Sequence, residues 1–567
     1  MTPLVTTPSR ALHAELRPVI GAQWINLALC ASLLAVAFAL RHSVSPAVWV
    51  RSTIILIVSL FMLLCSLKMR RGRRWAYVRA KWIAILGTIG FVGVAALPGP
   101  FPAWMRIEQG AQSLVFLALA WMLTRPALAS SFPRLKAPIP TKPILTDKAD
   151  SHPEPGARDA SLDYLRAFIV LLVLLHHSVL GYMVLWPAQP GTFKILPAPI
   201  VDPQRWAGFD FLVIFNDTFF MALMFLLSGL FVWPSLRRKG GARFLRDRIL
   251  RLGVPFAVAA AILMPLAYYP SYAVTGADPG FLAYARAWLS LGFWPSGPAW
   301  FIWLLLVFDA VAAGLYGLRH RWRVNALAPW PLGVHGRPSA CVAILLAISV
   351  LVYVPMELTF GADRWFTFGP FSFQASRLVL YAVYFLAGIQ LGASGTKSGF
   401  LAGLARPWSI WLSSGLAAYA LRLAVIVMLV LPVAVTHRPL PLSLRLLSDV
   451  TLVLCCGTIS FAFIALFRRF AVTRRPVFDS LSASSYGIYL VHYPFVVWLQ
   501  FALLTVALGA IAKGVTVFVG ATLLSWGTVV ALRRVPVIAR VLQSGGEGRA
   551  RTRPSPFQTE VRLTSRR

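Results

Sequence analysis

The feature that most restricts this chain is a series of apolar runs, each long enough to cross a lipid bilayer. An α-helix needs about 20 residues to cross a hydrocarbon core of about 30 Å. The sequence holds about fourteen such runs. Four lie at 22–40, 48–67, 82–98 and 111–124, and ten at 163–183, 210–234, 254–273, 297–317, 338–358, 376–395, 409–436, 446–467, 484–507 and 512–532. We therefore expect an all-α integral membrane protein, with a bundle of about ten helices preceded by about four extra transmembrane helices.

The two groups of runs are separated by a segment that cannot form a packed core. The stretch "RLKAPIPTKPILTDKADSHPEPGARDA" is rich in proline and charge, which is typical of an aqueous linker. We divide the chain into an N-terminal region (1–130), a cytosolic linker (131–160), a membrane domain (161–535) and a basic tail (536–567). The tail is expected to be disordered.

The net charge of +35, from 54 Lys and Arg against 19 Asp and Glu, raises the question of a nucleic-acid partner. The basic residues argue against one, because they cluster in alternate loops at 68–81, 237–251, 319–323 and 468–475 and in the tail. This is the positive-inside pattern of membrane proteins, whose basic loops face the cytosol and anionic lipid. It predicts a multi-pass protein of the cytoplasmic (inner) membrane with both termini in the cytosol and membrane lipid as a partner.

One predicted membrane helix carries ionisable residues: "SLDYLRAFIVLLVLLHHSVLGY" (161–182). Helix geometry puts Arg166 and His177 on one face, about 16 Å apart along the axis. Asp163 precedes Arg166 by three residues, a spacing that permits an ion pair. His176 falls within the same polar stripe, so geometry does not choose between the two histidines. With Arg166 near the cytosolic surface, the histidines are expected about halfway through the bilayer.

Two interpretations of this stripe stay open on the residues alone. In the structural interpretation, the ion pair caps the helix start and a histidine makes a polar contact with a neighbouring helix. In the functional one, a histidine is a base in a cavity, since ionisable residues inside membranes usually face a protein interior or water. Histidine suits this task because it can take and return a proton near neutral pH.

The segment "SLDYLRAFIVLLVLLHHS" resembles the opening of acyltransferase family 3, which includes bacterial O-acetyltransferases of surface polysaccharides and succinyltransferases of periplasmic glucans. The family motif is Arg or Lys, ten residues, then His, which selects His177 over His176. Four further segments resemble the family in order across about 160–535: "MALMFLLSGLF", "FLRDRILRLGVPF", "GPAWFIWLLLVFD" and "SASSYGIYLVHYPF". The four N-terminal helices lie outside the resemblance.

The resemblance implies roles for residues in these motifs. His177 would be the general base and Arg166 a second catalytic residue, with Asp163 and His176 as possible orienting groups. Guanidinium groups at the RxxR spacing can grip phosphate. The residues expected to bind substrate are Arg248, Arg251, Ser228, Gly229, Trp300, Tyr486, Tyr489 and His492. Small residues such as Ser228 and Gly229 also let helices approach closely, and an aromatic stripe is often simply core.

The expected function is therefore an integral membrane O-acyltransferase. It would move an acyl group, acetyl or succinyl, from cytosolic acyl-CoA to a hydroxyl of a glycan or glycolipid, with no metal and no bound cofactor. The main alternative is a proton-coupled transporter or flippase of a glycan or lipid precursor, although the sequence has no evident internal repeat. A catalytically inactive scaffold is the third reading. Asp309, in a deeply apolar run, is expected to have an ionic partner.

Overall fold

The structure, a computed structural model, describes residues 10–40, 46–96, 103–132, 159–185, 193, 198–291, 293–322, 338–394, 399–436 and 438–542. It is almost entirely helical and divides into two compact units, Met1–His152 with Val427–Pro432 and Pro153–Ile426 with Val433–Arg567. Within the described residues, ten helical segments are long and apolar enough to span a membrane. The chain is an all-α integral membrane protein, as the sequence predicts.

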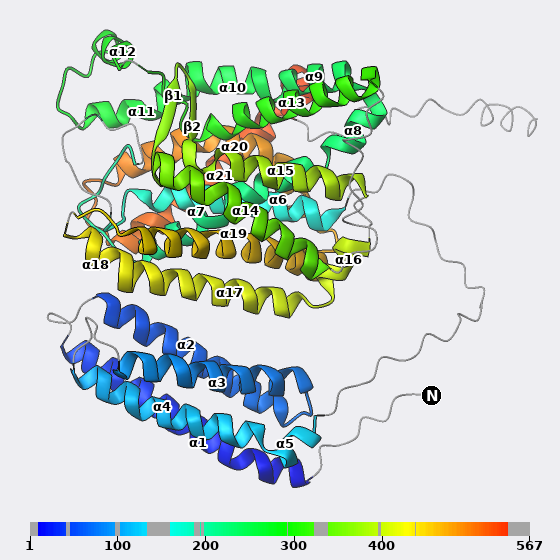
Figure 1. Ribbon diagram of the computed structural model, residues 1–567. Helices are drawn as coiled ribbons and strands as arrows, with labels where there is room; N and C mark the ends of the chain where they lie inside the picture. Colours follow the sequence, from blue (N-terminus) through cyan, green and yellow to red (C-terminus); the bar gives the residue numbers. More distant parts are fainter. Residues whose placement is uncertain are drawn as a thin grey trace, which may run out of the picture. The chain divides into compact units, whose positions relative to one another are not determined.

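The first unit contains α1 (Arg10–Ala39), α2 (Pro46–Met69), α3 (Arg74–Ala96), α4 (Ala103–Thr124) and α5 (Pro126–Ser130), at the blue end of the colour scale in Figure 1. Helix α3 packs along α4, and α1 along α2. Leu16, Met62 and Phe116 are fully buried in its core. Apolar contact between four long helices therefore forms a core within this unit.

The second unit begins with α6 (Ala160–Leu180) and α7 (Gly208–Gly229), followed by α8 (Val232–Lys239) and α9 (Gly241–Arg248). Two π-helical turns, Ile249–Gly253 and Ala259–Leu263, join α9 to α10 (Val254–Val258) and α11 (Met264–Ala273). The remaining elements are α12 (Phe281–Leu289), α13 (Trp300–Trp322), α14 (Pro338–Phe360), β1 (Trp365–Phe368), β2 (Phe371–Gln374), α15 (Leu378–Ala393), α16 (Gly399–Ala405), α17 (Trp408–Val425), α18 (Leu431–Ala434), α19 (Leu442–Phe470), α20 (Pro476–Ala502), α21 (Ala510–Leu532) and α22 (Pro536–Leu542).

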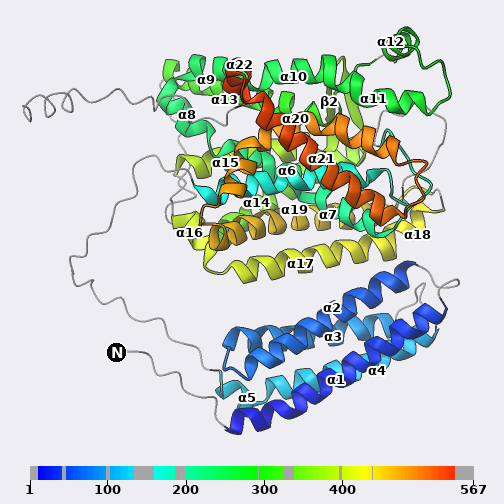
Figure 2. The ribbon, with the colours of Figure 1, turned by 180° about the vertical axis from the view of Figure 1, so that it is seen from behind.

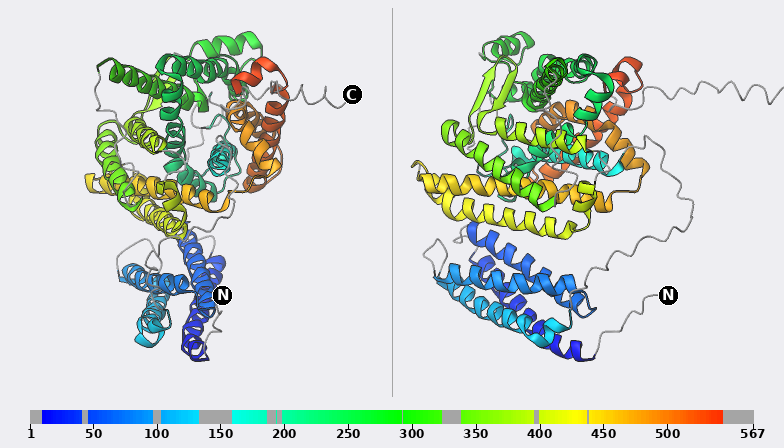
Figure 3. Two further views of the ribbon diagram at one scale, coloured as in Figure 1. Left: turned by 90° about the vertical axis from the view of Figure 1, so that its right-hand side faces the viewer. Right: turned by 45° about the vertical axis from the view of Figure 1, so that its right-hand side comes forward.

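Helix α6 lies inside the second unit and packs against α7, α19, α20 and α21. Seen nearly along the helix axes, it has neighbours on several sides (Figure 3, left). From behind, α20 and α21 lie beside one another (Figure 2). The Asp159 carboxylate caps the start of α6 by accepting from the Ser161 backbone N–H, 3.1 Å away. The helix that carries both histidines is therefore held from several directions.

Close backbone packing joins α7 to α15. A Cβ atom on Gly229 would collide with the carbonyl oxygen of Phe385, and one on Gly388 with that of Leu226. Glycines at such contacts let two helices approach more closely than any other residue would allow. Gly229 thus has a clear structural role in addition to the substrate contact that the resemblance implied.

The second unit has two different ends. At one end, which we call the basic end, α6 and α20 begin, and Arg166, Arg468 and Arg474 make ion pairs with Asp163, Asp159 and Asp479. At the opposite end, which we call the hairpin end, α6 finishes and the antiparallel strands β1 and β2 meet. Figure 1 shows α8 and α16 at the right of this unit and the hairpin with α11 and α12 at the left.

Candidate active site

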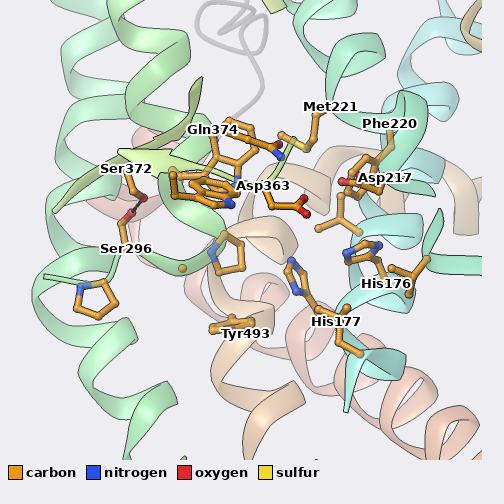
Figure 4. Close-up of a pocket in the computed structure, with 18 of the residues that line it drawn as sticks. His176, His177, Asp217, Phe220, Met221, Ser296, Asp363, Ser372, Gln374 and Tyr493 are labelled. Atoms are coloured by element: carbon orange, nitrogen blue, oxygen red, sulfur yellow. Dashed lines mark hydrogen bonds between the residues drawn. The ribbon is translucent and has the colours of Figure 1, made fainter. Parts of the chain in front are cut away.

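A cavity of about 540 Å³ lies at the hairpin end of the second unit. Its walls come from the last turns of α6, the first two thirds of α7, α11, the segment before α13, the hairpin, α15 and the second half of α20. The lining residues include His176, His177, Asp217, Phe220, Met221, Tyr268, Trp294, Ser296, Trp300, Asp363, Trp365, Thr367, Ser372, Gln374, Tyr381, Tyr489 and Tyr493. Figure 4 shows both histidines on one side and Ser296 and Ser372 on the other.

His176 and His177 both line this cavity, but with different neighbours. The His176 ring packs on Phe220, with centroids 5.2 Å apart, and Figure 4 shows it near Asp217. The His177 ring faces Tyr493, at 5.2 Å, and His492, at 5.5 Å. His177 lies in the last turn of α6, which ends at Leu180, and His176 immediately precedes that turn. The helix begins and ends three residues earlier than the predicted run 163–183, and the depth of the histidines in the bilayer stays a prediction.

His492 stands directly behind His177 and is fully buried. Its Nδ1 atom lies 2.7 Å from the backbone carbonyl oxygen of Tyr489, while its Nε2 atom has no hydrogen-bond partner. The Nδ1 atom of His177 is likewise buried without a partner. The site therefore holds three neighbouring imidazoles, those of His176, His177 and His492, each with one buried nitrogen that has no partner among the described residues.

An ion pair forms part of the wall beside His176. The Arg377 guanidinium contacts the Asp217 carboxylate at 2.5 Å and donates to the Asp217 backbone carbonyl at 2.8 Å. The arginine is buried, whereas the Asp217 side chain is 46% exposed, toward the cavity that it lines. This pair was not predicted from the sequence. The only local sign of it is that Asp217 is an acid within an apolar run, and its partner Arg377 lies 160 residues away.

The hairpin supplies a polar wall opposite the histidines. Its register pairs Trp365 with Gln374 and Thr367 with Ser372, and these four side chains share the face that lines the cavity. The alternate residues of each strand are phenylalanines on the other face. The Ser372 hydroxyl lies 3.0 Å from that of Ser296, and Figure 4 places the Asp363 carboxylate near the centre of the view.

Aromatic rings cover much of the remaining wall. Trp300 stacks on Tyr381, with centroids 5.8 Å apart, and meets Trp365 edge to face at 5.6 Å. Gly297, with a φ of 48° that favours glycine, forms the turn that leads the chain into α13 at Trp300. The cavity thus combines flat aromatic faces with carboxylate, amide and hydroxyl groups.

The predicted cationic residues lie at the basic end and do not line the cavity. Arg166 forms the expected ion pair with Asp163, and its guanidinium lies 5.4 Å above the Phe231 ring. Arg248 places Nε 3.1 Å from the carboxylate of Asp309, which is fully buried, so the expected ionic partner of Asp309 is Arg248. Arg166 therefore lies about half the length of α6 away from His177.

The other predicted substrate-binding residues divide between the cavity and the surrounding packing. Trp300 and Tyr489 line the cavity, and the Tyr489 hydroxyl donates to the Pro298 carbonyl. The Tyr486 hydroxyl donates to the Arg251 carbonyl and so ties α20 to the turn after α9. Arg251, Ser228, Gly229, Tyr486 and His492 are outside the cavity lining. Among the described residues, no group of three or more His, Cys, Asp or Glu could hold a metal ion.

Comparison with known proteins gives a consistent picture. A family model described as "Acyltransferase domain" matches residues 159–530. Curated relatives include the proteins named "Glucans biosynthesis protein C" from Salmonella paratyphi A, Salmonella agona and Salmonella heidelberg. Each is 24% identical over 250 residues, which make up 41% of this chain and 58% of the relative, so the match spans little more than half of those proteins. No solved structure matches.

Proposed function

The chain belongs to acyltransferase family 3, whose domain matches residues 159–530, and from this premise we propose that it is an integral membrane O-acyltransferase with His177 as its general base. The observation that carries the proposal is the position of His177. It follows Arg166 by the family interval and lines a cavity that also offers polar groups for a second substrate.

The proposed chemistry needs one base and two bound substrates. His177 Nε2 takes the proton of an acceptor hydroxyl as its oxygen attacks the acyl carbonyl of a thioester. A carbon–oxygen bond forms, the carbon–sulfur bond breaks, and the imidazolium returns the proton to the departing thiolate. Holding both substrates beside His177 supplies the proximity that makes such a transfer fast.

We assign the acceptor to the hairpin side of the cavity. The rings of Trp300 and Trp365 offer apolar faces against which a sugar ring can pack, while Asp363 and Gln374 can hydrogen-bond to its hydroxyls. The named function of the curated relatives, glucan biosynthesis, agrees with a carbohydrate acceptor. We therefore propose a hydroxyl of a glycan or glycolipid.

We assign the donor to the basic end. Acyl-CoA, carrying an acetyl or succinyl group, would bind its phosphates at Arg166, Arg248 and Arg251. The thioester would then approach His177 past Val173, Phe220 and Met221, which line the cavity on the stretches of α6 and α7 that lead toward Arg166. With the basic end in the cytosol of an inner-membrane protein, the acceptor would bind from the opposite side.

A transfer assay tests this function. The full-length protein, purified in lipid nanodiscs, is incubated with acetyl-CoA or succinyl-CoA labelled in the acyl group and with glucan oligosaccharides. We expect acyl label in the oligosaccharide and free thiol in equal amount. Thiol release without labelled sugar would point to another acceptor. Absence of both products with either donor, in protein that binds neither, would contradict the donor assignment.

A further inference from the structure

His492 lies beside His177, and the two imidazole rings are close enough to affect each other's protonation. The two ring centroids are 5.5 Å apart with the planes tilted by 36°, so the two imidazoles are neighbours. The nitrogens that lack partners are Nδ1 of His177 and Nε2 of His492. A buried polar atom normally has a partner, and these two atoms, like Nδ1 of His176, have none among the described residues.

The backbone carbonyl of Tyr489 determines which nitrogen of His492 carries the proton. A backbone carbonyl can only accept, so His492 Nδ1, 2.7 Å from the Tyr489 oxygen, must carry the proton. In a neutral imidazole the other nitrogen, Nε2, is then an acceptor. When His177 Nδ1 donates to that nitrogen, the ring proton of His177 lies on Nδ1, which leaves its Nε2 without a proton and able to act as a base.

Neither carboxylate of the cavity takes this place beside His177. The rings that pack against His177 are those of His176, His492 and Tyr493, and among the described ion pairs Asp217 is paired with Arg377 and not with His177. Helix α20 also fixes the backbone at this point, because Gln500 Nε2 donates to the carbonyls of His177 and Ser178 at 3.0 and 3.2 Å. One helix therefore holds both the main chain and the ring of His177.

We propose that His492 is the positioning residue of the general base. Its Nε2 accepts from His177 Nδ1, selects the tautomer in which His177 Nε2 carries no proton, and turns that nitrogen toward the acceptor hydroxyl. This inference rests on the proposed function, and it gives His492 an indirect role in place of the substrate contact that the resemblance implied. The buried position of His492, outside the cavity lining, agrees with such a role.

Two amide substitutions separate positioning from packing. His492→Asn keeps a donor where Nδ1 bonds the Tyr489 carbonyl but loses the acceptor at the Nε2 position. His492→Gln places an amide oxygen near the Nε2 position and loses the donor. We expect His492→Asn to lower kcat by about 100-fold with both KM values nearly unchanged, and His492→Gln to stay within about tenfold of the parent protein. A purely structural role predicts the reverse order.

The tautomer itself provides a second readout. The protein contains nine histidines, so the ¹⁵N signals of His177 are assigned by their loss in His177→Gln. We expect the Nδ1–H tautomer of His177 in the parent protein and its loss in His492→Asn. Full activity in His492→Asn, or an unchanged His177 tautomer in that variant, would overturn the inference. Full activity in His177→Gln would instead overturn the proposed function, so the two failures are distinguishable.

Discussion

Two adjacent histidines on α6 differ in what surrounds them, and this difference supports the proposal that His177 is the base. His176 is buried against Phe220 and lies near the Asp217–Arg377 pair. His177 is less buried and has a second imidazole behind it. The spacing rule selected His177 from the sequence, and the geometry adds a physical reason for the choice.

The Asp217–Arg377 pair leads to a prediction about the stability of the protein. Asp217→Asn leaves the buried Arg377 guanidinium without its counter-charge, and we expect the free energy of unfolding in detergent to fall by about 2 kcal/mol. This value lies below the cost for a fully buried pair because the Asp217 carboxylate is half exposed to the cavity. Denaturation curves of the purified protein measure the change.

The control for this prediction is the double variant Asp217→Asn with Arg377→Met. Removing both charges eliminates the unpaired cation, so the double variant should recover most of the lost stability. If Asp217→Asn alone were as stable as the parent protein, the ion pair would not contribute to holding α7 against the start of α15.

Between helices, the Arg248–Asp309 ion pair joins α9 to α13, and variants of this pair can separate an effect on donor binding from an effect on stability. Arg248→Ala leaves Asp309 buried without a counter-charge, so we expect a lower unfolding temperature. Adding Asp309→Asn should restore that temperature. If Arg248 also binds a donor phosphate, the KM for acyl-CoA should stay raised by about tenfold in the double variant.

Steady-state kinetics with acyl-CoA as the varied substrate make this comparison. Arg251→Ala is the matched variant, because Arg251 has no acidic partner among the described ion pairs. It should raise the same KM without lowering the unfolding temperature. Recovery of both stability and donor KM in the Arg248→Ala, Asp309→Asn double variant would reduce Arg248 to a structural role.

The elements also show where sequence reasoning succeeds and where it stops. The approximate positions of the helices were predictable because apolar length marks them, although α1 begins at Arg10 and α4 at Ala103, well before the predicted starts at 22 and 111. The Arg166–Asp163 pair followed from i,i+3 geometry. The β1–β2 hairpin was missed, although "WFTFGPFSF" alternates aromatic and polar residues about a Gly-Pro turn. Contacts such as Asp217 with Arg377 or His177 with His492 depend on tertiary packing, to which no local pattern points.

At the scale of the whole second unit, the account predicts which end faces which side of the membrane. Phe368, 83% exposed on the hairpin, and Arg238, exposed on α8, mark the two ends. In intact cells freed of their outer layers, a membrane-impermeant maleimide should label Phe368→Cys. It should label Arg238→Cys only after the membrane is opened, because basic loops stay in the cytosol.

The parent protein, with its five native cysteines in apolar segments, measures background labelling in the same experiment. Labelling of Arg238→Cys in intact cells, with Phe368→Cys protected, would show that the orientation is the opposite of the one predicted. It would also place the cavity that contains His177 on the cytosolic side, and the proposed route for donor and acceptor would have to be exchanged.

The central claim, that His177 is the base of an acyl transfer, is tested most directly by comparing His177→Gln with His176→Gln. Both proteins are purified in nanodiscs, checked for an unchanged unfolding temperature, and assayed for transfer from saturating acyl-CoA to oligosaccharide. The account predicts a kcat at least about 1,000-fold lower for His177→Gln and within about tenfold of the parent protein for His176→Gln. A fully active His177→Gln protein, or an inactive His176→Gln beside an active His177→Gln, would contradict it.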